Sequence, residues 1–278
     1  MSARASASRS AAGLLAAALL ALPPAAAGAA PSVVSINLCA DQLVLALADR
    51  GQILAVGPLA ADPALSAMHR EALAVPAVRG AAEEVVRLAP DLVVSGAAQQ
   101  RKTNALLSRM GFRVLALGAP DDVEGVAAMI GTVAGALGHP GRGARLAAEL
   151  RAAFRPPPGP PGPSALVWRP NGFVSGKGTL TDAALTAAGH ANAAALAGIG
   201  AWGTMPLERL LTAPPDLLVL DDHMTVKSSR AQALLVHPAL GRLAPPMRVG
   251  AVPTAEWLCP GPWMRAAVDR LRLLAWPG

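Results

Sequence analysis

Two similar segments, 125 residues apart, constrain the fold of this chain more than any other feature. Glu83–Val94 and Glu208–Val219 each begin with a Glu in a short helical pattern, carry Pro-Asp seven and eight residues later, and continue into an apolar run typical of a strand. Repetition of one helix-to-strand unit at this distance indicates two similar α/β lobes within one chain. It also places one Glu at the same structural position in each lobe.

The first 29 residues have the pattern of a secretory signal. Arg4 and Arg9 precede an apolar run at Ala11–Leu22, and small residues suited to cleavage follow near Ala27. The run is too short to span a bilayer, and no later apolar run reaches the roughly 18 residues that a transmembrane helix needs. We therefore expect residues 1–29 to be a signal peptide, rather than a disordered Ala-rich leader, and the mature protein to be exported.

The formal net charge of +6 comes mostly from Arg residues scattered along the chain. No basic block of the kind that marks nucleic-acid binding is present in the sequence. A solvated surface is the expected role of these charges, and no nucleic-acid partner is predicted.

Cys39 and Cys259 are the two cysteines of the chain. In an oxidising compartment such a pair is more often bridged than free. A bridge would close a very long loop and stabilise the fold by on the order of 4–5 kcal/mol in the chain-entropy model. Two buried, unreactive thiols are the alternative.

Strand-like runs alternate with helical patterns along both halves of the chain, which predicts parallel sheets covered by helices on both faces. An uninterrupted helical pattern from Gly141 to Phe154 ends in the Pro- and Gly-rich residues 155–163, which can form neither helix nor strand. We predict an N-terminal α/β lobe at 30–138, a backbone helix with a Pro-rich connector at 139–163, and a C-terminal α/β lobe at 164–278.

The order and spacing of these features make the chain resemble the periplasmic substrate-binding proteins of the helix-backbone class. These proteins deliver ferric siderophores, haem or vitamin B12 to ABC importers. The segments that carry the resemblance are Asn37–Gln42, the two Glu segments, Gly176–Thr179 and Trp257–Trp263. It implies an α/β fold with two lobes, each with a parallel central sheet, joined by a single long backbone helix. It also implies a monomeric periplasmic protein that binds a ligand without catalysis, cofactor or resident metal.

The resemblance further implies a role for the repeated Glu. In this family one exposed Glu on each lobe docks onto Arg pockets of the membrane permease, and the matching residues here are Glu83 and Glu208. A carboxylate accepts a bidentate guanidinium, so two such contacts would fix both position and rotation on the importer. Each Glu could instead serve only the positive start of its own helix, and Glu84 is a possible substitute for Glu83.

The ligand site is implied to lie between the lobes, on loops at the strand ends, where open α/β sheets place ligands. Flat indole rings suit a large metal chelate, although Trp also commonly packs in cores. Arg169 could meet carboxylates of a siderophore or haem, or form a surface ion pair. The implied ligand-binding residues are Asn37, Arg169, Trp202, Glu256, Trp257 and Trp263.

Ala77 and Ser95 stand where the vitamin B12-binding relative carries aromatic residues. This difference argues against a corrinoid, so we expect a ferric siderophore or related iron complex, with cobalamin or haem, bound by the same mechanism, as the alternative. In this family the segments of Cys39 and Cys259 face the cleft, so a bridge between them would tie the lobes together and limit their opening.

Other site classes find weaker support. None of the His residues has a metal-ligand spacing, which argues against a direct zinc or manganese receptor. Gly172–Thr179 lacks the spacing and the hydroxyl residue of a P-loop. Asp221-Asp222-His223 is the densest polar cluster, but no Ser in a nucleophile elbow accompanies it as a hydrolase would require. The five His residues are His69, His139, His190, His223 and His237.

Overall fold

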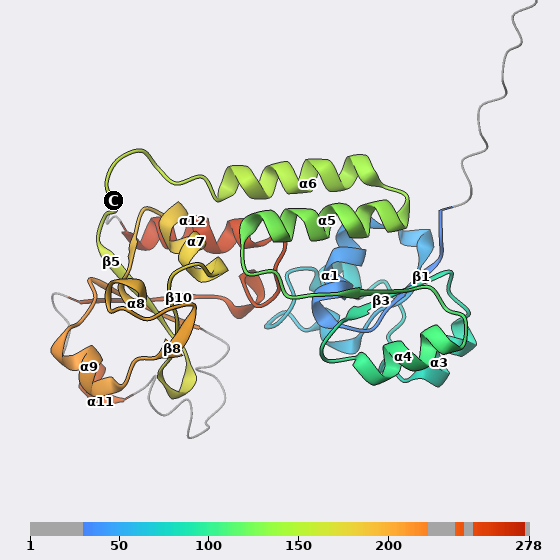
Figure 1. Cartoon of the computed structure of the whole chain (residues 1–278), viewed down its shortest axis with the longest axis horizontal. Helices are drawn as coiled ribbons and strands as arrows, with labels where there is room; N and C mark the ends of the chain where they lie inside the picture. The colour runs from blue at the N-terminus through green and yellow to red at the C-terminus, as the bar shows by residue number, and fades with distance from the viewer. Residues whose placement is uncertain (1–29, 222–236, 242–246, 276–278) are drawn as a thin grey trace, which may run out of the picture.

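The computed structural model describes residues 30–221, 237–241 and 247–275. In this part of the chain two α/β lobes lie side by side, the N-terminal lobe on the right of Figure 1 and the C-terminal lobe on the left. Each lobe contains a four-stranded parallel sheet, so the predicted fold class is confirmed. No helix within these ranges has the length and apolar character that crossing a bilayer would require. The predicted signal peptide lies outside them.

The sheet of the N-terminal lobe has the order β2-β1-β3-β4. Its side chains alternate between two cores: Val33 and Leu92 pack with α1 and α5, while Val34 and Val93 pack with α3 and α4. The strands are β1 (Val33–Ser35), β2 (Ile53–Ala55), β3 (Leu92–Gly96) and β4 (Val114–Leu117). The helices are α1 (Leu38–Leu47), η1 (Arg50–Gln52), η2 (Pro58–Ala61), α2 (His69–Ala72), α3 (Ala82–Leu88), α4 (Arg101–Arg109) and α5 (Val123–Leu137).

The sheet of the C-terminal lobe has the order β10-β9-β5-β7, and a two-stranded antiparallel sheet, β6-β8, lies beside it. Along β5, Ala165 and Val167 enter the core that both lobes share, while Leu166 and Trp168 pack with α8 and α9. The strands are β5 (Ser164–Trp168), β6 (Phe173–Ser175), β7 (Ala191–Asn192), β8 (Trp202–Thr204), β9 (Leu217–Asp221) and β10 (Arg248–Val252). The helices are η3 (Pro170–Gly172), α7 (Leu180–Ala187), α8 (Ala193–Leu196), α9 (Leu207–Thr212), α11 (Pro238–Gly241), η4 (Thr254–Glu256) and α12 (Met264–Ala275).

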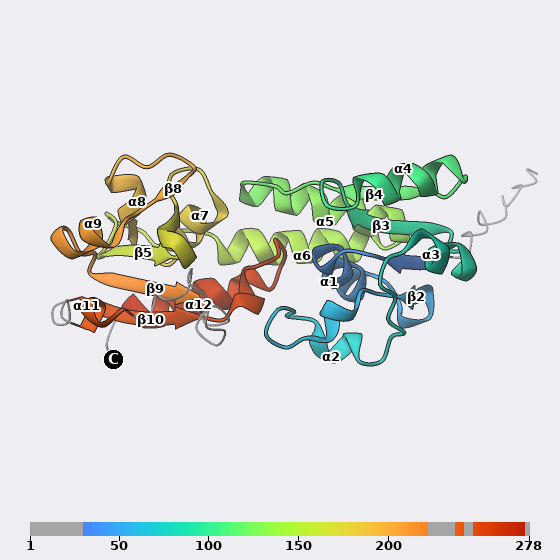
Figure 2. The ribbon, with the colours of Figure 1, turned by 90° about the horizontal axis from the view of Figure 1, so that it is seen from below.

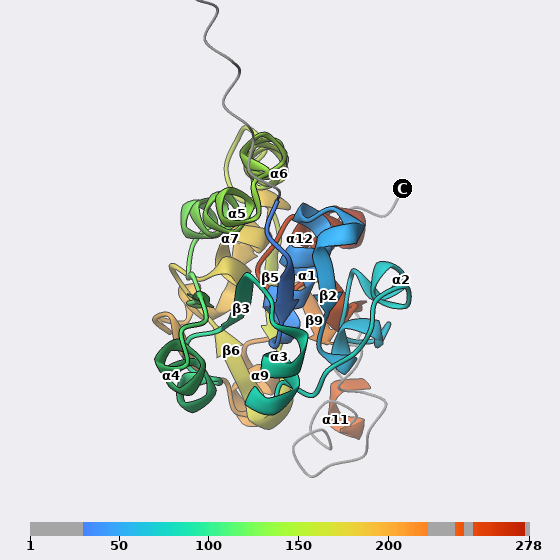
Figure 3. The ribbon, with the colours of Figure 1, turned by 90° about the vertical axis from the view of Figure 1, so that its right-hand side faces the viewer.

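The chain passes from the first lobe to the second through α6 (Pro140–Ala153). This helix packs against α5, and the two run side by side (Figure 2), above the sheets as Figures 1 and 3 are drawn. Gly143 allows the close approach, because a Cβ there would lie 2.3 Å from the Cβ of Ala134. At the other end, Arg272 of α12 donates hydrogen bonds to the carbonyls of Ala153 and Ala187, at 3.1 and 3.0 Å. The backbone helix is therefore embedded in a core shared by both lobes.

The Asp of each repeated segment has the same structural task in its lobe. Asp91 Oδ2 accepts hydrogen bonds from the backbone N–H and the hydroxyl of Ser32, at 2.8 and 2.7 Å. Asp216 Oδ2 accepts the same pair from Ser164, at 2.7 and 2.8 Å. These bonds, led by the serine hydroxyl, hold the pKa of both carboxyl groups below the usual range. Each Asp thus joins the start of one strand to the start of its parallel neighbour, β3 to β1 and β9 to β5.

Candidate functional site

The carboxyl ends of β1, β3 and β4 open onto a pocket of about 160 Å³. Residues 96–99 and 117–119 form its walls together with Asn37 and Met129, and Pro260 reaches it from the C-terminal lobe. Parallel strands place ligands at this edge of their sheet. The pocket therefore lies where the two lobes meet, which is the place that the resemblance implies for the ligand site; ligand binding there stays a prediction.

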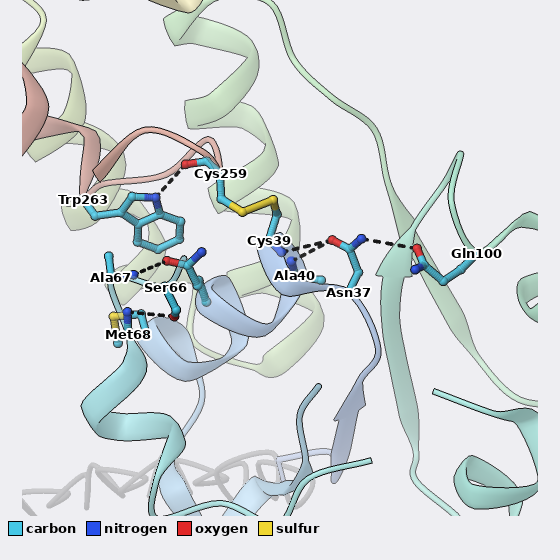
Figure 4. The surroundings of a disulfide bond; sticks show 10 residues. Asn37, Cys39, Ala40, Ser66, Ala67, Met68, Gln100, Cys259 and Trp263 are labelled. Carbon is cyan, nitrogen blue, oxygen red and sulfur yellow. Dashed lines mark hydrogen bonds between the residues drawn. A yellow bond between two sulfur atoms is a disulfide. The ribbon is translucent and has the colours of Figure 1, made fainter. Parts of the chain in front are cut away.

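Asn37 stands at the wall between this pocket and a second one of about 290 Å³. Its side-chain oxygen caps α1 by accepting hydrogen bonds from the N–H groups of Cys39 and Ala40, at 3.1 and 3.3 Å. Its amide group donates to Gln100 Oε1 at 3.3 Å, and the same oxygen accepts from Gly96 N–H at 3.1 Å (Figure 4). These contacts hold the side chain in place at the rim and tie the ends of β1 and β3 together.

Asp41, one turn further along α1, contributes to the lining of the second pocket although it is buried. Burial raises the pKa of its carboxyl to about 6, against the smaller lowering effects of the Ser35 hydroxyl and the backbone of Gly57 and Asn37. Neither carboxyl oxygen makes a well-formed hydrogen bond within the described residues. A glycine at position 57 leaves room for this carboxyl group, because a Cβ there would lie 2.7 Å from Asp41 Oδ2. Sequence reasoning missed this group; its signal was an acid on the apolar side of a short helix.

A disulfide joins Cys39 at the start of α1 to Cys259 in the segment before α12. Figure 4 shows Trp263 beside it, with the indole N–H donating to the carbonyl of Cys259 at 2.6 Å. The ring of Trp263 also packs against the shared core. The bridge therefore links the two lobes at the pocket, and Trp263 supports the loop that carries Cys259.

Two of the predicted ligand-binding residues, Arg169 and Trp257, meet inside the C-terminal lobe, and Glu256 lies next to Trp257 in the sequence. The guanidinium of Arg169 lies 5.4 Å from the ring centroid of Trp257 and donates hydrogen bonds to the hydroxyls of Ser175 and Thr181, at 3.0 and 3.3 Å. Trp257 is buried, and its N–H has no hydrogen-bond partner among the described residues. Glu256 is half-buried and forms a bidentate ion pair with Arg270 at 2.6 and 3.1 Å.

Trp202 is the predicted aromatic residue that is open to solvent, with 56% of its surface exposed. Its ring stacks on that of Phe173, with centroids 5.8 Å apart and an interplanar angle of 18°. The antiparallel pairing of β6 with β8 brings the two together. Phe173 was missed at the sequence level, because nothing in its Gly-rich surroundings predicts that pairing.

Two of the histidines that were considered as metal ligands have structural partners. His139 contacts Gln52 at 2.6 Å, and His190 contacts the carbonyls of Pro163 and Leu271, so both have structural partners. Within the described ranges no group of three or more His, Cys, Asp or Glu could hold a metal ion. Asp221 ends β9, whereas Asp222 and His223 lie outside the described residues.

The two repeated Glu residues occupy matching places, each the second residue of its helix, Glu83 in α3 and Glu208 in α9. Both side chains are exposed, and no hydrogen bond or ion pair engages either carboxylate within the described residues. Glu84 differs, because its carboxylate accepts a hydrogen bond from Ala81 N–H at 3.3 Å and so caps α3. The structure thus leaves Glu83, not Glu84, available for an outside partner.

Comparison with known proteins gives a consistent result. A family model described as periplasmic binding protein matches residues 33–248. Comparison with curated protein sequences found no match.

Three solved structures resemble the chain over most of its length. The apo periplasmic haem-binding protein RhuT from Roseiflexus sp. RS-1 has 25% identity and a TM-score of 0.64, with 89% of this chain and 100% of that one covered. The haem-binding protein BhuT, in complex with two haems, has 26% identity and a TM-score of 0.66, with coverages of 88% and 97%. The vitamin B12-binding protein BtuF of Vibrio cholerae has 16% identity and a TM-score of 0.61, with coverages of 88% and 96%, a likeness of fold alone.

Proposed function

Because the chain belongs to the periplasmic binding protein family, we propose that it is the solute-binding component of an ABC import system. It captures a metal chelate between its lobes in the periplasm, without chemical turnover, and delivers it to a permease in the inner membrane. Residues 1–29 direct its export.

The observation that carries this proposal is the pocket between the lobes. Three strand ends of the N-terminal lobe and Pro260 of the C-terminal lobe surround it. Among the described residues Pro260 alone lines it from the C-terminal lobe, and its volume of about 160 Å³ would admit one edge of a chelate whose remainder lies between the lobes. Leu43, Leu117 and Met129 give it an apolar wall, which suits the hydrocarbon frame of a chelate.

For the chelate itself, a planar metal tetrapyrrole has the most support, and haem comes first. Both structures at 25–26% identity are haem-binding proteins. The exposed Phe173–Trp202 pair offers a flat apolar surface of the kind that stacks on a macrocycle. A ferric siderophore is the second candidate, because Ala77 and Ser95 replace aromatic residues of the vitamin B12-binding relative.

A titration tests the proposal. Haemin, cyanocobalamin and a ferric hydroxamate are each added to the purified mature protein, and Trp fluorescence and the absorbance of the chelate are followed. Haemin should bind with quenching and be recovered unchanged. Phe173→Ala and Trp202→Ala should each weaken its binding by up to about tenfold, as expected for the loss of about 0.5–1.5 kcal/mol of stacking. Leu196→Ala, at an exposed site of the same lobe, should leave the binding unchanged. Binding of none of the three chelates, or consumption of one, would refute the proposal.

A further inference from the structure

A groove of about 520 Å³ runs between α3 and α4, away from the pocket between the lobes. Ala82, Val86, Leu106 and Met110 give it an apolar lining, and the charged side chains of Glu83 and Arg87 also border it. Leu106 is 38% exposed and Met110 is 50% exposed. Apolar surface of this kind, gathered in one groove, is typical of an interaction site.

The second lobe repeats the arrangement. A groove of about 290 Å³ lies beside α9, the helix of Glu208, with Leu196 and Leu210 in its lining. Here Arg209 donates a hydrogen bond to the carbonyl of Ala197 at 2.9 Å, which ties α9 to the end of α8. Each Glu therefore stands on a helix that borders a groove, but Glu208 does not itself line its groove as Glu83 does, and the groove of larger volume belongs to the N-terminal lobe.

We propose that the groove between α3 and α4 is a docking site for the permease, and that it takes a bulky apolar side chain from a periplasmic loop that also carries an Arg or Lys. This proposal rests on the proposed function and adds an apolar anchor to the docking role predicted for Glu83. An exposed ion pair contributes little on its own, whereas an apolar side chain enclosed in a groove supplies most of the affinity of such contacts.

Charge complementarity selects this occupant. The carboxylate of Glu83 has no partner in the described structure, and Arg87, one turn along α3, forms no ion pair with it within 4 Å. It remains able to accept a guanidinium at the rim while the neighbouring side chain enters the groove. A second copy of this chain is the alternative occupant, and a change in self-association distinguishes it from the permease.

The test measures permease binding and ligand binding on the same variants of the full mature chain. The permease of the same import system is reconstituted in nanodiscs, and haemin is the ligand probe. Leu106→Ser/Met110→Ser should weaken permease binding at least tenfold, and Glu83→Arg should weaken it similarly, while both keep haemin affinity. Leu273→Ser is the matched control, because Leu273 is 77% exposed on α12, on the opposite side of the molecule from α3 (Figure 1).

The outcomes separate the two proposals. If the double variant binds the permease as tightly as the wild type while Glu83→Arg does not, the groove proposal is wrong and the proposed function stands. If the double variant instead changes only self-association in sedimentation, the groove serves copies of this chain and the proposal is again wrong. If no chelate binds to the wild type, the proposed function itself fails.

Discussion

Replacing Cys39 and Cys259 by Ser removes a covalent link between residues 220 positions apart in the sequence. In the chain-entropy model a closed loop of this length restricts the unfolded chain enough to stabilise the protein by about 5 kcal/mol. The total stability of a protein is typically about 5–15 kcal/mol. The disulfide is therefore expected to supply a large share of the free energy of unfolding.

The folded state should tolerate the change. The lobes share a continuous core through α5, α6, α7 and α12, so they remain in contact without the bridge. The carbonyl of Cys259 still accepts the hydrogen bond from the indole of Trp263, because a backbone group makes it. The loss should thus appear as a lower urea midpoint, with haemin binding retained.

Urea unfolding of the wild type and the double Ser variant, each with and without dithiothreitol, checks this. We expect the variant to lose at least about 2 kcal/mol, the lower end of typical disulfide contributions, and reductant to bring the wild type down to the variant's midpoint. Reductant should leave the variant unchanged. Equal midpoints without reductant, or two alkylated thiols per unreduced, unfolded wild-type chain, would refute the reasoning.

Three further predictions concern single residues. The pKa of Asp41 is raised to about 6, against 3.8 in the unfolded chain, so the free energy of unfolding falls as pH rises from about 4 through 6. Asp41→Asn should therefore be more stable than the wild type by about 3 kcal/mol at pH 8 and equal to it near pH 4. Urea unfolding of both proteins across this pH range measures the difference, and parallel pH profiles would contradict the prediction. The pKa of Asp91 is lowered, so the stability that this carboxylate contributes is present at neutral pH and lost in acid. Ser32→Ala should therefore lower the free energy of unfolding at pH 6 and lower it progressively less toward pH 2. A difference from the wild type that stays constant with pH would exclude this origin. Gly143→Val should lower the free energy of unfolding by about 1–3 kcal/mol, because the added side chain forces α6 away from α5. Gly141→Ala, whose new methyl group meets nothing within 4 Å, should leave the melting temperature unchanged or raise it. Equal losses of stability in the two variants would contradict the packing argument.

The periodicity of the sequence was sufficient to predict two α/β lobes, because buried parallel strands and amphipathic helices leave local patterns. The side chains of the site were harder to place, because long-range contacts decide their surroundings. Glu256 could be predicted near Trp257, but its ion pair with Arg270 depends on how α12 folds back onto that segment. Phe173 could not be predicted, because its role follows from the pairing of β6 with β8.

The repeated segment shows how one pattern can carry two separate tasks. Its Asp is used within the fold, since Asp91 and Asp216 each accept two hydrogen bonds from a serine at the start of the neighbouring strand. Its Glu has no such partner among the described residues of either lobe, and a favourable position at a helix N-terminus contributes only about 0.3–1 kcal/mol. The fold therefore explains the Asp, whereas the Glu is explained mainly by the docking role that we propose for it. In that proposal the groove beside α3 gives the partner an apolar surface to bind.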